Sequence, residues 1–307
     1  MSTSPAPTTT ALAKVVPTPT EKYAAIEKYM AGKVDTFTAV LPKNLGLTPE
    51  KFMKMILYST QRNPDLLDCT KQSLFLAAMQ AADLGLPVGT GLAYLIPYKN
   101  KEKKVTEAQF QPDYKGLIAI LLETGDVTRI DLESVYEKDE LELVHGTDGS
   151  RLIHKPYWKG ARGAAVAYYA IATLRGGGTK FLLMTRDEIE QVKKNYVQDG
   201  SPAWAKSYDE MAKKVVFKRL YKTMRRLSAN DRAGRAIEHD DRAQAGEAPD
   251  FSDVIEAAGE VIETPTPKQV AEATAVAPVK TADRAREEVA AKAAAIEAKA
   301  APAPVGA

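Results

Sequence analysis

A run of basic residues at helical spacing is the strongest chemical signal in this sequence of 307 residues. The segment MAKKVVFKRLYKTMRRL (211–227) contains no acidic residue, although lysines spaced four apart on one helix repel one another. At 100° per residue, one face carries Lys214, Lys218, Lys222, Arg225 and Arg226, with Arg219 at its margin. The opposite face carries Val216, Phe217, Leu220, Met224 and Leu227, and Lys213 lies towards that apolar side. This basic face predicts a site for several phosphate groups, and an ordinary solvated lysine-rich helix is the alternative.

A second basic cluster lies in KNKEKK (99–104), between two strand-like segments. Its cations are Lys99, Lys101, Lys103 and Lys104, and the neighbouring aromatic residues are Tyr94, Tyr98, Phe110 and Tyr114. Ammonium groups beside aromatic rings are typical of proteins that bind single-stranded nucleic acid, although aromatic residues in strands more often belong to the core. Tyr114, Lys115 and Gly116 begin a helix, where backbone N–H groups favour phosphate and the glycine permits close approach of another backbone.

Other kinds of chemistry have weaker support. GLPVGTG (85–91) lacks the Gly-Lys-Ser/Thr of a phosphate-binding loop, and no G-x-S-x-G is present. His145 and His154, with Asp148 between them, could form a base and its orienting group, but ordinary strand-end histidines are the simpler interpretation. A metal-dependent nuclease could use the carboxylates Asp131, Glu133, Glu137, Asp139, Glu140 and Glu142. Alternation along a strand would separate them onto two faces. With one cysteine and three histidines, we expect no disulfide, metal centre or cofactor.

The elements that must position these residues indicate an α+β fold, a mostly antiparallel sheet bracketed by helices. Helices are expected over 48–63, beginning at Thr48 and Pro49, over 70–85, over 114–125 and over 185–197, and a last one over 201–229. Strands are expected over 92–98, 106–112, 127–137, 140–146, 151–154, 163–175 and 179–185, with Gly176–Gly178 as a hairpin turn.

The two ends of the chain differ from the body in composition. Residues 1–20 are mostly Thr, Pro, Ala and Ser, and residues 241–307 are rich in Ala, Glu, Pro and Thr, so both are expected to be disordered around a DNA-binding domain at 21–235. Residues 250–263 could form a short acidic amphipathic element. Residues 21–230 carry a net charge of about +7 and residues 231–307 about −6. The basic body favours polyanions, and with neither a signal sequence nor a membrane span we expect a cytoplasmic protein.

Five blocks in order resemble the RecT family of phage single-strand annealing recombinases. They are QAADLGLPVGTGLAYLIPYKNK, AQFQPDYKGLIAILLETGDV, VYEKDELELVHG with LIHKP, AVAYYAIATLRGGGTKFLLMTRDEIEQV, and WAKSYDEMAKKVVFKRLYK. They extend from about residue 45 to residue 230, over most of the expected folded body.

The resemblance implies a curved antiparallel sheet crossed by a helix, and a protein that anneals single-stranded DNA without ATP. It also implies rings or helical filaments and a partner 5′–3′ exonuclease. It assigns DNA binding to Tyr114, Lys115, Gly116, Lys213, Lys214, Lys218, Arg219 and Lys222, and also to Arg151 and His154. After KRLYK the family often has Leu-Pro, whereas here Met224, Arg225 and Arg226 extend the basic helix.

Two other functions remain open at this point. A passive single-strand coating protein would bind DNA but slow annealing, and a nuclease would need a metal ion. The acidic tail could mimic DNA or recruit a host single-strand-binding protein.

Overall fold

Threonine residues cap the helices at the N-terminal end of the fold. The Thr18 side chain accepts a hydrogen bond from the Glu21 amide at the start of α1 (Pro19–Ala31). Thr48 does the same for α3 (Pro49–Arg62) and Thr70 for α4 (Lys71–Asp83), as the sequence predicts for these two helices. No helix was expected before residue 48, but the structure has two there, α1 and α2 (Val34–Val40).

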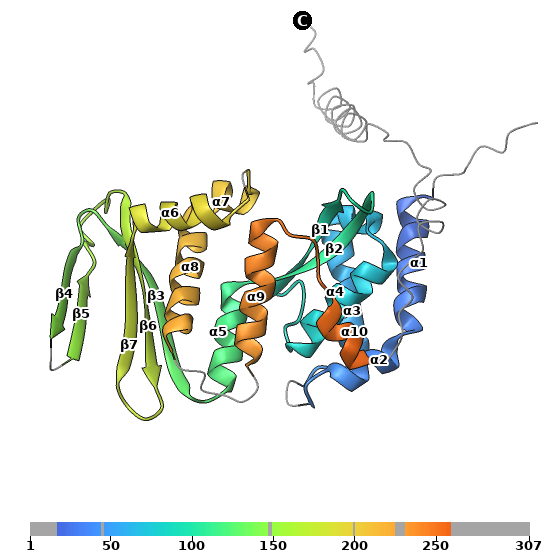
Figure 1. Ribbon diagram of the computed structural model, residues 1–307, viewed down its shortest axis with the longest axis horizontal. Coiled ribbons are helices and arrows are strands. Elements are labelled where there is room, and N and C mark those ends of the chain that lie inside the picture. The colour runs from blue at the N-terminus through green and yellow to red at the C-terminus, as the bar shows by residue number, and fades with distance from the viewer. Residues whose placement is uncertain (1–16, 44–45, 147–148, 199, 225–230, 259–307) are drawn as a thin grey trace, which may run out of the picture. The chain divides into compact units, whose positions relative to one another are not determined.

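The computed structural model describes residues 17–43, 46–146, 149–198, 200–224 and 231–258 (Figure 1). All the described residues belong to one structural unit, Pro17–Glu263. The expected disordered segment at 1–20 lies outside the described residues up to residue 16, and α1 begins at Pro19.

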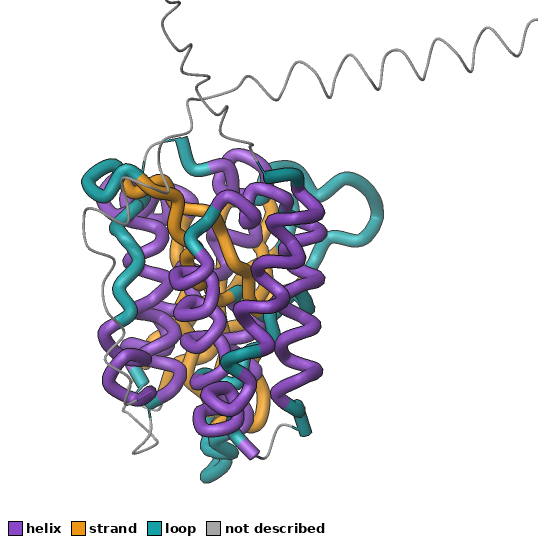
Figure 2. Tube along the Cα trace, turned by 90° about the vertical axis from the view of Figure 1, so that its right-hand side faces the viewer, coloured by secondary structure: helices purple, strands orange, loops and turns teal. Residues whose placement is uncertain are grey.

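Helix α4 is the centre of the N-terminal half. Its small side chains Ala77, Ala78, Ala81 and Ala82 are fully buried, which lets neighbouring elements pack closely against the helix. The helices α1, α2 and α3 and the 3₁₀ helix η2 (Pro64–Asp68) pack together beside α4. Helix α4 in turn packs against the hairpin of β1 (Ala93–Asn100) and β2 (Val105–Pro112), and η2 contacts β1. Figure 2, viewed from the side of α1, shows these helices in front of the strands. Helix α5 (Tyr114–Glu123) follows β2.

A second antiparallel sheet holds β3 (Val127–Tyr136), β6 (Ala165–Leu174) and β7 (Thr179–Thr185) in the order β3-β6-β7. Alternation along β6 gives this sheet two buried faces. Tyr168, Ala170 and Ala172 join the main core beneath α8 (Tyr208–Thr223), whereas Ala167 and Tyr169 pack against the hairpin of β4 (Glu140–Gly146) and β5 (Gly149–Lys155). The mixed helix and antiparallel-sheet class is therefore confirmed, with the strands divided among three sheets.

Two expectations about the C-terminal half need correction. The helix expected over 201–229 is two helices, α7 (Pro202–Lys206) and α8, because Ser207 has φ −142° and ψ 54° and interrupts the helical backbone. Helix α6 (Arg186–Tyr196) precedes them, close to its expected range.

The folded part also continues beyond residue 235, where the domain was expected to end. Helix α9 (Arg232–Ala245) packs against β2 and α5, and α10 (Ser252–Ala258) packs against α4. The Gln80 side chain in α4 donates hydrogen bonds to the Asp250 carbonyl at 2.6 Å and to Asp253 at 2.9 Å. Residues 241–258 are therefore part of the fold and not of a solvated tail, whereas 259–307 lie outside the described residues.

Candidate nucleic-acid interface

The basic face of α8 is only partly exposed. Lys214 and Lys218 are buried, and the Asp240 carboxylate of α9 lies between them, 2.5 Å from the Lys214 ammonium and 2.7 Å from that of Lys218. The acidic groups missing from 211–227 thus come from a helix some twenty residues further on. The open face expected at Lys214 and Lys218 is not found, because both side chains are buried and paired with a carboxylate of α9.

Asp240 has no exposed surface and is held by four side chains. Besides the two lysines, Gln244 donates to it at 3.2 Å and Gln111 at 3.4 Å. Burial by itself would raise the pKa of Asp240, but the charges of Lys214 and Lys218 outweigh burial and lower the pKa to about 2. Burial likewise opposes the charged form of Lys218, yet Asp240 and Asp241 raise its pKa. This cluster is a charged part of the core.

Asp241, the next residue of α9, meets the exposed end of the same face. Its carboxylate lies 2.6 Å from the Lys218 ammonium and 3.1 Å from that of Lys222, and its side chain is 43% exposed. The Lys222 side chain is 61% exposed. Arg219 is exposed, and its guanidinium lies 3.9 Å from the Met184 sulfur. Lys222 and Arg219 are therefore the exposed cations on this face of α8, and the Lys218 ammonium reaches the cleft beside Asp241.

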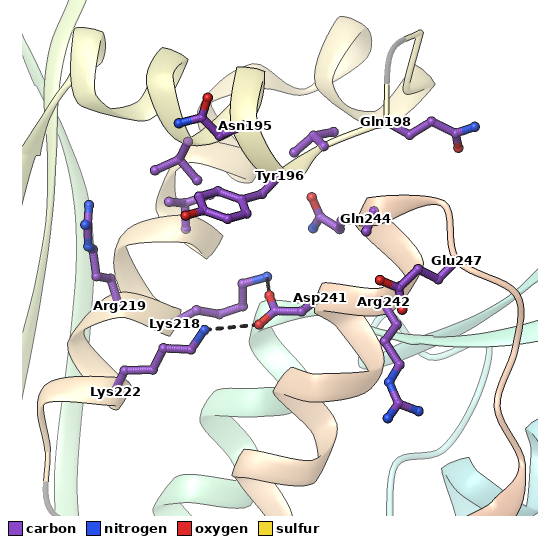
Figure 3. Close-up of a pocket in the computed structure, with 14 residues that line it drawn as sticks. Asn195, Tyr196, Gln198, Lys218, Arg219, Lys222, Asp241, Arg242, Gln244 and Glu247 are labelled. Carbon is purple, nitrogen blue, oxygen red and sulfur yellow. Dashed lines mark hydrogen bonds and ion pairs between the residues drawn. The ribbon is translucent and has the colours of Figure 1, made fainter.

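These residues line a cleft of about 700 Å³ between the end of α6, α8 and the end of α9 (Figure 3). The basic side chains in it are Lys218, Arg219, Lys222 and Arg242, and the acidic ones are Asp241 and Glu247. Tyr196, Asn195 and Gln244 also line the cleft. The sequence did not indicate these three residues or Arg242 as site residues, because the chain brings α6 and α9 to α8 only through tertiary packing.

The β1–β2 hairpin places the second basic cluster at its tip. Lys99, Lys101 and Lys104 are exposed and have no ion pair within the described part of the chain, whereas Lys103 pairs with Glu107 at 2.9 Å. The hairpin contacts the C-terminal end of α9, where the Tyr98 hydroxyl donates to the Gly246 carbonyl at 3.2 Å and Gln109 donates to the Glu247 carbonyl at 3.1 Å. Because Glu247 also lines the cleft, the end of α9 connects the two basic surfaces.

The start of α5 is engaged mainly in packing. The Tyr114 hydroxyl donates to Glu210 at 2.6 Å, and burial together with this hydrogen bond raises the pKa of Tyr114. Lys115 is exposed, with its ammonium 5.7 Å from the centre of the Tyr114 ring. A Cβ atom at Gly116 would collide with the Leu92 carbonyl oxygen. The close backbone approach that this glycine permits is therefore to Leu92, inside the protein.

The aromatic residues near the hairpin divide between core and surface. Phe110 is buried and Tyr98 is partly buried, whereas Tyr94 is 45% exposed. Lys213 lies beside Glu210 at 3.2 Å, while Arg225 and Arg226 lie outside the described residues.

The other candidates lie on the β4–β5 hairpin. Arg151 is exposed and pairs with Glu142 at 2.5 Å. The His154 side chain is buried between the Tyr169 hydroxyl and Asp139, so its role is structural. Arg162 holds the pKa of Asp139 well below its usual range, and Asp139 also accepts from the Tyr136 and Tyr157 amides.

The alternative in which a histidine pairs with Asp148 as base and orienting group falls on residue 148, which lies outside the described residues. The His145 ring stacks on Phe181 and meets the Ser150 hydroxyl at 2.9 Å. Among the described residues, no group of three His, Cys, Asp or Glu side chains is placed to hold a metal ion, and no helix is long and apolar enough to span a membrane.

Comparison with known proteins gives one consistent result. The sequence model of the RecT family matches residues 50–253, from α3 to α10. Protein RecT of Escherichia coli strain K12 is 32% identical over 192 residues, which are 61% of this chain and 70% of that protein. Uncharacterized protein YqaK of Bacillus subtilis strain 168 is 30% identical over 176 residues, 57% of this chain and 58% of that protein.

Proposed function

Because this chain belongs to the RecT family of single-strand annealing recombinases, we propose that it binds single-stranded DNA and anneals complementary strands without ATP. The observation that carries the proposal is the family match over residues 50–253, which takes in the β1–β2 hairpin, α8 and α9. The exposed cations at the hairpin tip and in the cleft support it, since phosphate neutralisation supplies most of the sequence-independent affinity for DNA.

In this mechanism the protein makes and breaks no covalent bond. Lys222 and Arg219 in the cleft, with Lys99, Lys101 and Lys104 at the hairpin tip, neutralise backbone phosphates and hold the strand extended. Exposed aromatic rings support the bases by stacking. The pairing edges stay open, so that a second strand can test complementarity. Base pairing drives annealing, and the protein lowers the repulsion between the two backbones.

Further proposals come from the family and from composition. Subunits assemble on DNA as a ring or filament, so that neighbouring clefts make one continuous track. A 5′–3′ exonuclease supplies the single strand, and a host single-strand-binding protein meets the C-terminal tail. The protein acts in the cytoplasm of a bacterial host.

The test follows the annealing of two complementary oligonucleotides by fluorescence quenching, without ATP and with a chelator. The variant is Arg219→Ala/Lys222→Ala, because replacing Lys214 or Lys218 would leave Asp240 buried and uncompensated. The matched control is Lys51→Ala/Lys54→Ala, which removes the same charge from exposed positions of α3. We expect wild type and control to accelerate annealing and the cleft variant to lose most of that acceleration.

The alternatives give different results in the same assay. If the wild type binds DNA but slows annealing, it is a coating protein. The nuclease is tested by a parallel reaction with Mg²⁺ in place of the chelator: if the protein degrades the oligonucleotides there and leaves them intact with the chelator, it is a nuclease. Either outcome overturns the proposal.

A further inference from the structure

Asp241 is the acidic residue of the cleft that pairs with two lysines of α8. Its carboxylate lies between the Lys218 and Lys222 ammonium groups, at 2.6 and 3.1 Å, which is an arrangement that a phosphodiester oxygen pair can also take. Asp241 differs from its neighbour Asp240 in exposure, 43% against 0% for the side chain. The Lys222–Asp241 pair is partly exposed on both sides and contributes little to stability, and the buried Lys218 keeps its pair with Asp240, so exchanging the Asp241 carboxylate for a phosphate costs little.

Tyr196 gives the same cleft an aromatic wall. It is the last residue of α6, it is 70% exposed, and its ring lies above Lys218 and Lys222 in the view of Figure 3. The wall is fixed to α9, because the Gln198 amide donates to the Gln244 carbonyl at 2.9 Å. An exposed ring on an anchored backbone is suited to stacking on a nucleobase.

We propose that this cleft binds one unpaired nucleotide of a DNA strand, with the phosphate in place of the Asp241 carboxylate between Lys218 and Lys222 and the base stacked on Tyr196. A volume of about 700 Å³ lies within the range of small-ligand pockets. The inference rests on the proposed function and adds a selection: a base inside a duplex is covered by its neighbours on both sides and cannot stack on Tyr196.

The end of α9 gives the strand a path out of the cleft. Gly246 and Glu247 contact Tyr98 and Gln109 of the β1–β2 hairpin, so a strand leaving the cleft along this end passes towards the lysines of the hairpin tip. Arg242 flanks the path and is paired with Asp250 at 2.6 Å. Glu247 also lines the cleft and carries the opposite charge.

The experiment measures fluorescence anisotropy with two labelled 20-mers, oligo-dT and an abasic strand of the same backbone. Asp241→Asn is compared with Glu238→Gln, which removes the same charge at an exposed position of α9. Tyr196→Leu is compared with Tyr58→Leu, an exposed ring on α3. Thermal melting checks that all four variants fold.

We expect Asp241→Asn to tighten binding of both strands about threefold, beyond any gain from Glu238→Gln. Tyr196→Leu should weaken the binding of oligo-dT about fivefold and leave the binding of the abasic strand unchanged. Tyr58→Leu should change the binding of neither strand. The inference is overturned if Asp241→Asn binds DNA no more tightly than Glu238→Gln. It is also overturned if Tyr196→Leu loses affinity equally for oligo-dT and for the abasic strand. If the wild type anneals normally while these variants match their controls, the cleft assignment alone fails. A wild type that neither binds nor anneals overturns the proposed function as well.

Discussion

Asp240 shows how a single buried residue can determine whether a neighbouring face is available to a ligand. Its carboxylate neutralises Lys214 and Lys218 where α9 faces α8, so both lysines stabilise the protein. Lys214 is enclosed, whereas the Lys218 ammonium also pairs with Asp241 and lines the cleft. One residue further along α9, Asp241 pairs with Lys222 at the rim of the cleft. Two adjacent aspartates thus have different roles because only one of them is removed from water.

Asp240→Asn should lower the free energy of unfolding by about 3–5 kcal/mol, because two buried ammonium groups lose their counter-charge. Asp241→Asn, at a partly exposed position, should cost under about 1 kcal/mol. Urea denaturation at neutral pH measures both. Equal effects would show that the buried cluster does not stabilise the fold.

The stability difference between wild type and Asp240→Asn should depend on pH, because the pKa of Asp240 is lowered in the folded protein. A carboxyl group whose pKa falls from 3.8 unfolded to about 2 folded stabilises the protein fully above the unfolded value. That stability is lost as the pH falls towards the folded value. The difference in stability between wild type and Asp240→Asn should therefore narrow by about 2 kcal/mol between pH 4 and pH 2. A constant difference across this range, in urea titrations at each pH, would contradict the assignment.

At the scale of elements, the end of α9 and the whole of α10 belong to the fold, although the composition indicated that a disordered tail begins at residue 241. Val254 of α10 is 1% exposed, and Gln80 of α4 depends on Asp250 and Asp253 for its hydrogen bonds. Truncation after residue 245 should lower the free energy of unfolding by roughly 2–4 kcal/mol, through lost burial and unpaired polar groups. Truncation after residue 258 should change it by less than about 0.5 kcal/mol. Chemical denaturation of the two shortened chains distinguishes them, and equal stability would mean that α10 adds nothing to the fold.

The role of the acidic C-terminal segment must be tested with a deletion that begins after residue 258. A deletion from residue 241 would remove Asp241 and Arg242 from the cleft together with the tail. The deletion of 259–307 leaves α9 and α10 intact, and we expect unchanged or tighter DNA binding from it.

The β1–β2 hairpin is an element whose exposed lysines can be removed without damage to the core. Lys101→Ala/Lys104→Ala should weaken oligo-dT binding several-fold at low salt, because each lysine neutralises a phosphate. The melting temperature should not change, since both side chains are exposed and have no ion pair among the described residues. Lys51→Ala/Lys54→Ala on α3 is again the matched control. Equal losses in the two double variants would indicate only a general charge effect.

For the whole molecule, the proposed function predicts a strong salt dependence of binding. Each phosphate neutralised on a single strand contributes about −0.7 to the slope of log K against log salt concentration. Arg219→Ala/Lys222→Ala should therefore make the slope shallower by about 1 to 1.5, as measured by anisotropy at several salt concentrations. An unchanged slope would remove these two cations from the DNA-binding surface.

Self-assembly is the second property of the whole molecule that can be measured. With DNA, sedimentation should show a species much larger than one chain of 33.4 kDa. A single monomer at micromolar concentration with DNA present would contradict the ring or filament.

Local features of the fold were predictable because they depend on residues close together in the chain. Thr48 and Thr70 mark helix starts through hydrogen bonds to amides three residues away. The glycine hairpin and the alternating strands give β6 and β7. The resemblance to the RecT family was likewise present in the order of the sequence blocks, and the family match confirmed it.

The candidate interface was only partly predictable, because burial and charge pairing depend on residues far apart in the chain. The spacing placed Lys214, Lys218 and Lys222 on one face of α8, but the sequence could not show that α9 covers two of them. Nor could it bring Tyr196 to the same cleft. The sequence by itself determined the helices α3 to α6, the strands and the family. Tertiary structure decided which cations face solvent, because a lysine becomes part of the core when a distant carboxylate compensates for its removal from water.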